Sequence, residues 1–213
     1  MGFKSLNDWL AEGAHKKTKD EPKYGCVMMD AKIDNWEEFH LDGIDDDDLY
    51  LKPGDDSYGK ETQPHITILY GIHEEEIDPQ RMADMMEHYM ERAILPITEV
   101  DVFENEDYDV VKYNIPVTPQ LQRYHDLFLK LPNTQNFPTF QPHMTIAYVK
   151  PGLGKKYKST LTNPFKVIFD KAVYSWHPNK DKKKSTDPDK LSRKVVNLKK
   201  DTKEKDNGIS TDL

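Results

Sequence analysis

The chain contains the same eight-residue phrase twice. Residues 63–70 read QPHITILY and residues 141–148 read QPHMTIAY, so the two copies agree at six of the eight positions. Each copy carries a His and a Thr two residues apart. Because side chains of a β-strand alternate between its faces, each His shares a face with its Thr, and the intervening apolar residues point into a core. The repeat therefore predicts two half-buried strands that each present an imidazole and a hydroxyl.

These residues are His65 and Thr67 in the first copy, and His143 and Thr145 in the second. Cleavage of a phosphodiester requires one proton taken from the attacking oxygen and another delivered to the leaving oxygen, which a pair of imidazoles can do near neutral pH. The neighbouring hydroxyls can stabilise charge on the non-bridging oxygens. A single HIT or HMT is more often structural, but the repeat retains its polar residues as faithfully as its apolar ones. It therefore favours catalysis that needs no metal or other cofactor.

A duplicated H-x-T motif on two strands resembles the 2H phosphoesterase superfamily. That group includes the RNA 2′,3′-cyclic phosphodiesterases called 2′-5′ RNA ligases, cyclic phosphodiesterases, and phage enzymes that degrade cyclic-oligonucleotide defence signals. The resemblance covers about residues 23–177. It implies that His65 and His143 are the catalytic acid–base pair and that Thr67 and Thr145 bind the phosphate. It also implies that the two motif strands flank a central cleft.

The rest of the pattern predicts an α+β fold of two pseudo-symmetric lobes, with antiparallel sheet inside and helices outside. Asp78-Pro79 and Thr118-Pro119 are typical helix starts, and each is followed by apolar residues at helical spacing. The methionine-rich stripe of the first helix is expected to pack in the core. The predicted strands are 24–29, 64–70, 97–103, 109–117, 142–149 and 165–176, with a short helix at 34–40.

Charge is unevenly distributed along the chain. Residues 179–213 hold 11 Lys and Arg against 7 Asp and Glu, a net charge of +4, so residues 1–178 carry −12 of the total of −8. We expect a polar N-terminal arm at 1–22, the 2H phosphoesterase-like domain at 23–178 and a Lys-rich, flexible tail at 179–213. An acidic body is poorly suited to duplex DNA and favours a small nucleotide or short oligonucleotide as partner.

Cellular location follows from what the sequence lacks. It has no apolar run long enough to span a membrane and no secretory signal, and its one cysteine, Cys26, excludes an internal disulfide. We therefore expect a cytoplasmic protein with no membrane partner, which would act in the host cytoplasm if it is phage-encoded. The sequence does not indicate an oligomeric state.

Four further residues are predicted to contact substrate. Tyr24, at the start of the first expected strand, and Trp176, at the end of the last, can stack on nucleobases; the alternative for each is an aromatic residue of the rim or core. Lys60 and Lys150 can steer a phosphate. Strict alternation along the motif strands places the Tyr that ends each copy, Tyr70 and Tyr148, on the core side.

Three function classes stay open at this level. The first is a metal-independent phosphodiesterase that cleaves a cyclic oligonucleotide, a 2′-5′ or 3′-5′ linkage or a 2′,3′-cyclic phosphate. Its favoured biological role is that of a phage enzyme that degrades cyclic-oligonucleotide signals, and the next is RNA-end repair. The second is a nucleotide-binding module without catalysis. The third is a metal site formed by His65, His143, His73 and an Asp, against which the absence of H-E-x-x-H or clustered Cys/His spacing counts.

Overall fold

A computed structural model describes residues 24–55, 57–135, 137, 139–177 and 191–199. Seven strands and two α-helices make up most of it, which confirms the predicted α+β class. The strands are β1 (Tyr24–Lys32), β2 (His65–His73), β3 (Ala93–Phe103), β4 (Asp109–Asn114), β5 (His143–Val149), β6 (Ser159–Trp176) and β7 (Ser192–Asn197). The helices are α2 (Pro79–Tyr89), α3 (Pro119–Phe128), a π-helical turn at Glu37–Leu41, and 3-10 turns at Asp46–Asp48, Glu74–Glu76 and Gly154–Tyr157.

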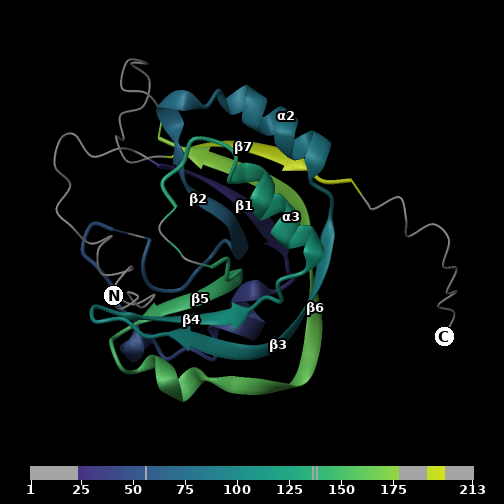
Figure 1. Cartoon of the computed structure of the whole chain (residues 1–213). Coiled ribbons are helices and arrows are strands. Elements are labelled where there is room, and N and C mark those ends of the chain that lie inside the picture. Colours follow the sequence, from purple (N-terminus) through teal and green to yellow (C-terminus); the bar gives the residue numbers. More distant parts are fainter. Residues whose placement is uncertain (1–23, 56, 136, 138, 178–190, 200–213) are drawn as a thin grey trace, which may run out of the picture.

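All strands belong to one antiparallel sheet with the order β2-β1-β6-β3-β4-β5, and β7 pairs with β6. The strand β6 joins the two lobes: residues 168–176 pair with β1 and β7, and residues 159–169 pair with β3. It ends at the residue expected for the range 165–176 but begins earlier, at Ser159. In Figure 1 it runs along one side of the molecule from one lobe to the other. Although β2 and β5 lie at opposite ends of the strand order, they contact each other.

Both predicted helix starts are confirmed. The Asp78 carboxylate accepts from the N–H of Gln80, and the Thr118 hydroxyl accepts from that of Leu121, each with Pro as the next residue. Helix α2 packs on β7 and β6, and α3 packs on β2, so both cover the outside of the same lobe (Figure 1). Met82 and Met86 are fully buried, as predicted for the methionine stripe.

The segment that precedes each motif strand is hydrogen-bonded to the other motif strand. Residues 59–61, which precede β2, bond to β5: the N–H of Glu61 donates to Ile146 O at 2.9 Å and that of Tyr148 to Gly59 O at 2.8 Å. Residues 132–134, which precede β5, bond to β2: the N–H of Thr134 donates to Gly71 O at 2.9 Å. The outer edge of each motif strand is thus paired with the residues that lead into the other motif strand.

Gly71 makes this crossing possible, and its substitution should be costly. Its φ is +96°, and a Cβ added there would lie 2.4 Å from the Thr134 carbonyl oxygen. We expect Gly71→Ala to lower the free energy of unfolding by about 2–5 kcal/mol, since left-handed backbone and overpacking both oppose it. Gly152→Ala is the matched control, because its φ of +80° is similar but nothing lies within 4 Å. Equal losses for the two variants in urea unfolding would show that the crossing is not tightly packed.

Part of the expected tail forms an edge strand. Residues 192–197 pair with β6, and Leu198, just beyond them, is buried because it packs into the core. The expectation of a flexible tail therefore does not hold for β7, whose residues alternate between partly buried and exposed, as in a strand covered on one face. The arm at 1–22 and the remaining tail residues lie outside the described residues. None of the helices in the described ranges is long and apolar enough to cross a membrane.

Candidate functional site

The two motif histidines are held in the same way. The Nδ1 of His65 lies 2.8 Å from the carbonyl oxygen of Gln63, and the Nδ1 of His143 lies 2.9 Å from that of Gln141. A carbonyl oxygen can only accept, so Nδ1 is the protonated nitrogen in each ring, and Nε2 is the acceptor of the neutral form. The repeated Gln-Pro thus supplies a backbone oxygen that fixes the tautomer of each imidazole.

Each motif strand contains a β-bulge at the same position of the repeat. In β2, Thr67 pairs with Met28 and Leu69 with Val27, so Ile68 has no partner on β1. In β5, Thr145 pairs with Lys112 and Ala147 with Val111, so Ile146 has none on β4. An extra residue in one strand shifts the alternation of all residues that follow it.

The bulges bring the repeated tyrosines to the same side as the threonines. Two consecutive residues are buried after each Thr, and Tyr70 is then half exposed while Tyr148 is partly buried. Both tyrosines line the cavity that also contains Thr67 and Thr145. The prediction that Tyr70 and Tyr148 face the core is therefore wrong, because strict alternation does not continue through a bulge. Retention of Tyr in both copies was the signal in the sequence.

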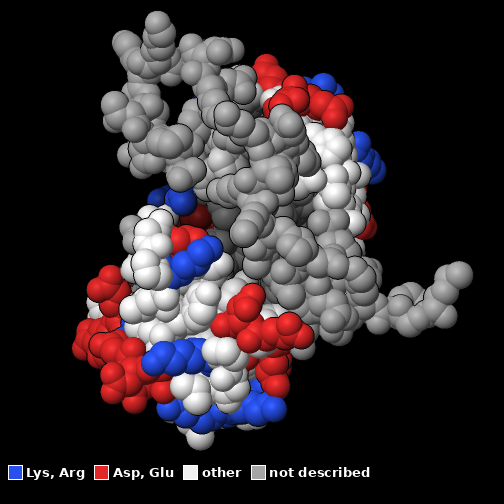
Figure 2. All heavy atoms as spheres, turned by 90° about the vertical axis from the view of Figure 1, so that its left-hand side faces the viewer, with Lys and Arg blue, Asp and Glu red and all other residues white. Residues whose placement is uncertain are grey.

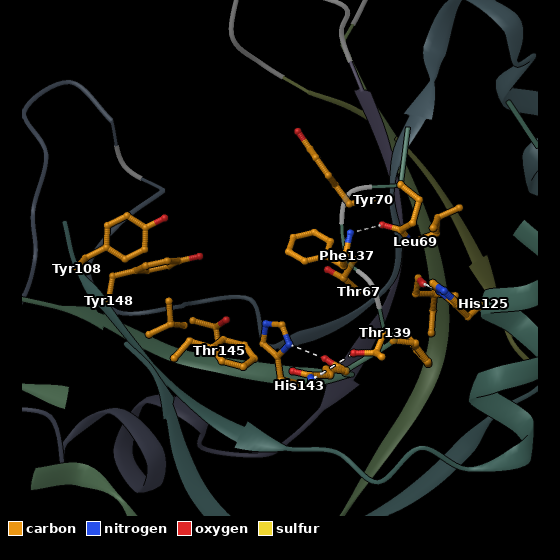
Figure 3. Close-up of a pocket in the computed structure, with 16 residues that line it drawn as sticks. Thr67, Leu69, Tyr70, Tyr108, His125, Phe137, Thr139, His143, Thr145 and Tyr148 are labelled. Atoms are coloured by element: carbon orange, nitrogen blue, oxygen red, sulfur yellow. Dashed lines mark hydrogen bonds between the residues drawn. The ribbon is translucent and has the colours of Figure 1, made fainter. Parts of the chain in front are cut away.

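The cavity lies between the two motif strands and has a volume of about 170 Å³. In Figure 3, Thr67 and Tyr70 project from one side, and His143, Thr145 and Tyr148 from the other. Its remaining walls are largely aromatic and apolar. They include Ile68, Leu69, Phe103, Tyr108, Val110, His125, Gln135, Phe137, Thr139, Phe140 and Gln141. An apolar cavity with a few polar groups at its floor is typical of a small-molecule site.

The imidazole of His143 is held in its neutral form. Burial lowers the pKa of His143 to about 4; the hydrogen bond to Gln141 opposes this change, while the positive charges of Lys112 and His65 add to it. His65 is thus near enough to His143 for their charges to interact. At neutral pH the Nε2 of His143 is able to accept a proton.

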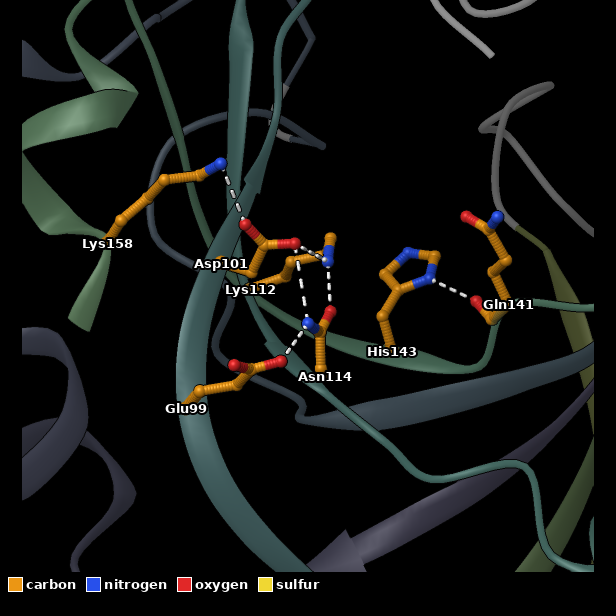
Figure 4. Close-up of polar contacts among 7 residues, drawn as sticks. All are labelled: Glu99, Asp101, Lys112, Asn114, Gln141, His143 and Lys158. Atoms are coloured by element: carbon orange, nitrogen blue, oxygen red, sulfur yellow. Dashed lines mark hydrogen bonds and ion pairs between the residues drawn. The ribbon is translucent and has the colours of Figure 1, made fainter. Parts of the chain in front are cut away.

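A buried lysine beside His143 was not found by the sequence reasoning. Lys112 is 2 % exposed, and its Nζ donates to Asp101 Oδ2 at 3.2 Å and to Asn114 Oδ1. Its Nζ also lies 4.2 Å from the ring centroid of Phe103, which is 4.9 Å from that of His143. Figure 4 shows this network next to the imidazole. The available signal was a lysine within the strand-like run DVVKYN, where a charge needs a partner.

The four predicted substrate contacts lie elsewhere, and none of them lines the cavity. Tyr24 packs edge-on against Tyr70, which does line the cavity, with 6.1 Å between ring centroids. The ring of Trp176 stacks on Tyr174. Lys60 pairs with Asp46 at 2.7 Å, and the Nζ of Lys150 donates to Asp47 O at 2.6 Å. Their roles in substrate binding stay predictions.

The residues considered for a metal site are not gathered together. His73 interacts with Glu76 Oε1 and Thr134 Oγ1, each at 2.9 Å. Over the ranges that the structure describes, no group of three or more His, Cys, Asp or Glu side chains is placed to hold a metal ion.

Charged side chains of both signs are mixed on the face drawn in Figure 2, and acidic ones are gathered on the lower lobe. Among the described residues on that face there is no continuous basic surface of the kind that long polyanions require.

The chain matches one family model and resembles several solved structures. A model of the "2'-5' RNA ligase superfamily" matches residues 32–173. Among solved structures, one described as a phosphoesterase is 11 % identical, with 84 % of this chain and 100 % of that chain covered and a TM-score of 0.48. E. coli LigT in its apo form is 12 % identical, with 85 % of this chain and 100 % of the LigT chain covered and a TM-score of 0.49. LigT complexed with 3'-AMP is also 12 % identical, with 84 % and 100 % covered and a TM-score of 0.48. No curated protein matches.

Proposed function

The chain belongs to the 2′-5′ RNA ligase superfamily, and on this premise we propose that it is a metal-independent phosphodiesterase that acts on a small nucleotide substrate. His65 and His143 are the acid–base pair, and Thr67 and Thr145 bind the phosphate. The observation that carries the proposal is the matching geometry of the two histidines. Each has Nδ1 bonded to the carbonyl oxygen two residues earlier, on strands that meet from opposite edges of one sheet.

The reaction balances with these four side chains. One imidazole takes the proton from a water or a ribose 2′-hydroxyl through Nε2 as the attacking oxygen forms its bond to phosphorus. The other, as imidazolium, gives its Nε2 proton to the leaving oxygen as that P–O bond breaks. The hydroxyls of Thr67 and Thr145 donate to the non-bridging oxygens, where charge develops.

For the substrate, we propose a short or cyclic oligonucleotide. The aromatic walls support this choice, because bases stack on tyrosine and phenylalanine rings, and the repeat presents Tyr70 from one lobe and Tyr148 from the other. A phage-encoded enzyme that removes cyclic-oligonucleotide signals in the host cytoplasm is the biological role proposed first. Opening of 2′,3′-cyclic phosphates at RNA ends is the alternative enzymatic role.

Turnover in excess EDTA tests the proposal. The panel consists of 2′,3′-cyclic nucleotides, 2′-5′ and 3′-5′ linked oligoribonucleotides, and cyclic di- and trinucleotides, with product release followed by chromatography. Cleavage of one class that resists the chelator is expected and identifies the substrate. Tight binding of one member without turnover would instead identify a nucleotide-binding module, and loss of activity in EDTA would contradict the metal-independent mechanism.

The tyrosines brought into the cavity by the bulges should contribute to substrate binding. Stacking of one base contributes about 1–3 kcal/mol, so Tyr70→Ala and Tyr148→Ala are each expected to raise KM by roughly 5- to 150-fold with a smaller change in kcat. Tyr89→Ala is the matched control, since Tyr89 is 51 % exposed and Tyr70 50 %, but Tyr89 lies on α2 away from the cavity. Unchanged KM in both cavity variants would exclude stacking on these rings.

A further inference from the structure

Residues next to the two motif strands break the symmetry of the repeat. In the first lobe, Asp30 on β1 lies directly opposite His65, and the apolar Met28 lies opposite Thr67. In the second lobe, the neutral Asn114 on β4 lies opposite His143, and Lys112 lies opposite Thr145. Residues directly opposite in an antiparallel pair share a face of the sheet. A carboxylate therefore accompanies His65, whereas an ammonium group accompanies His143.

We infer that Asp30 and Lys112 are positioning residues that assign opposite roles to the two histidines, with His65 as the general acid and His143 as the general base. This inference rests on the proposed function. In the reaction, His143 takes the proton of the attacking oxygen, and the His65 imidazolium, facing the Asp30 carboxylate, protonates the leaving oxygen. The direction of proton transfer is thus set by strands β1 and β4, which lie outside the repeated motif.

The contacts around His143 support its role as base. The ammonium group of Lys112 lies over the face of the Phe103 ring, and the Phe103 and His143 rings meet edge to face. Phe103 thus contacts both the ammonium group and the imidazole. The other charged groups of this cluster have partners other than His143. They are Asp101, which pairs with both Lys112 and Lys158, and Glu99, which accepts from Asn114. Among the surrounding charges, those of Lys112 and His65 are the ones that lower the pKa of His143, after burial.

The surroundings of His65 have the opposite character. Partial burial of Asp30 raises the pKa of its carboxyl. The positive charges of His65, Arg193 and Lys171 lower this pKa, and the negative charge of Asp170 raises it. Arg193 itself is directed to the side-chain oxygen of Gln63 at 2.6 Å. A positively charged His65 therefore has a carboxylate counter-charge at close range, and His143 has none among its described neighbours on β4.

The pH dependence of kcat/KM tests the assignment, with the substrate found in the EDTA panel. A base must be deprotonated and an acid protonated, so the acid limb of the profile reports the base and the basic limb the acid. Lys112→Met, which copies the residue at the equivalent position of the first lobe, should move the acid limb to higher pH by up to about one unit. Asp30→Asn should move the basic limb to lower pH. Lys112→Arg, which retains the charge, should leave the acid limb in place.

The outcomes separate this inference from the proposed function. If Lys112→Met and Asp30→Asn turn over substrate and both limbs of the pH profile stay in place, the inference alone is overturned. A basic limb that moves to higher pH in Lys112→Met also overturns it, because His143 would then be the acid. Absence of turnover in the wild-type protein overturns the proposed function instead. If Lys112→Met does not fold, Asp30→Asn still decides, because a basic limb that stays in place contradicts the role of His65 as acid.

Discussion

Replacing either His65 or His143 with alanine is expected to reduce kcat by about 10²–10⁴-fold, because general acid–base catalysis contributes that much. Both rings lie at the strand starts with one carbonyl contact each through Nδ1, and neither is fully buried. Their removal should therefore change stability little, which near-UV circular dichroism and urea unfolding can verify. Because the two residues act in one reaction, the double variant should be only slightly slower than the slower single variant.

His88→Ala is the control for this pair. His88 is an exposed histidine on α2 whose ring contacts only that of its neighbour Tyr89 among the ring contacts of the described residues. It should retain wild-type kcat. Full activity of a folded His143→Ala protein would eliminate the two-histidine mechanism, whatever the behaviour of His65→Ala.

Loss of one phosphate-binding hydroxyl should have the next largest effect. Thr67→Val and Thr145→Val keep the shape of the side chain but remove the donor, and one such donor contributes about 10²–10³-fold to kcat. The loss should appear in kcat more than in KM, because charge on the non-bridging oxygens is greatest in the transition state. Steady-state kinetics on both variants measures the two constants separately.

Thr162→Val provides the matched comparison, since Thr162 is an exposed threonine of β6 and valine suits a strand. It should behave as the wild type. A result in which Thr145→Val raises KM but leaves kcat unchanged would show that the hydroxyl binds ground state and transition state equally, and would remove it from the proposed catalytic role.

Much of the fold could be predicted from local pattern. Both helices begin at the expected Asp-Pro and Thr-Pro, and the repeat marks the two motif strands, because capping and alternation depend on neighbouring residues only. Local pattern failed for Tyr70 and Tyr148. A bulge is defined by the pairing of one strand with another. The partners of the two motif strands, β1 for β2 and β4 for β5, are distant from them in sequence.

The amino-acid pattern alone predicts the duplicated pairs, His65 with Thr67 and His143 with Thr145. It also predicts that each pair shares a strand face, because alternation with a period of two needs no partner strand. The meeting of β2 and β5, the two ends of the strand order, across a cavity is visible in the three-dimensional fold and not in the local pattern. The different electrostatic surroundings of the two histidines likewise come from the three-dimensional fold. Burial and the charge of Lys112 act through space, and the pairing of β4 with β5 that brings Lys112 to His143 is a long-range contact.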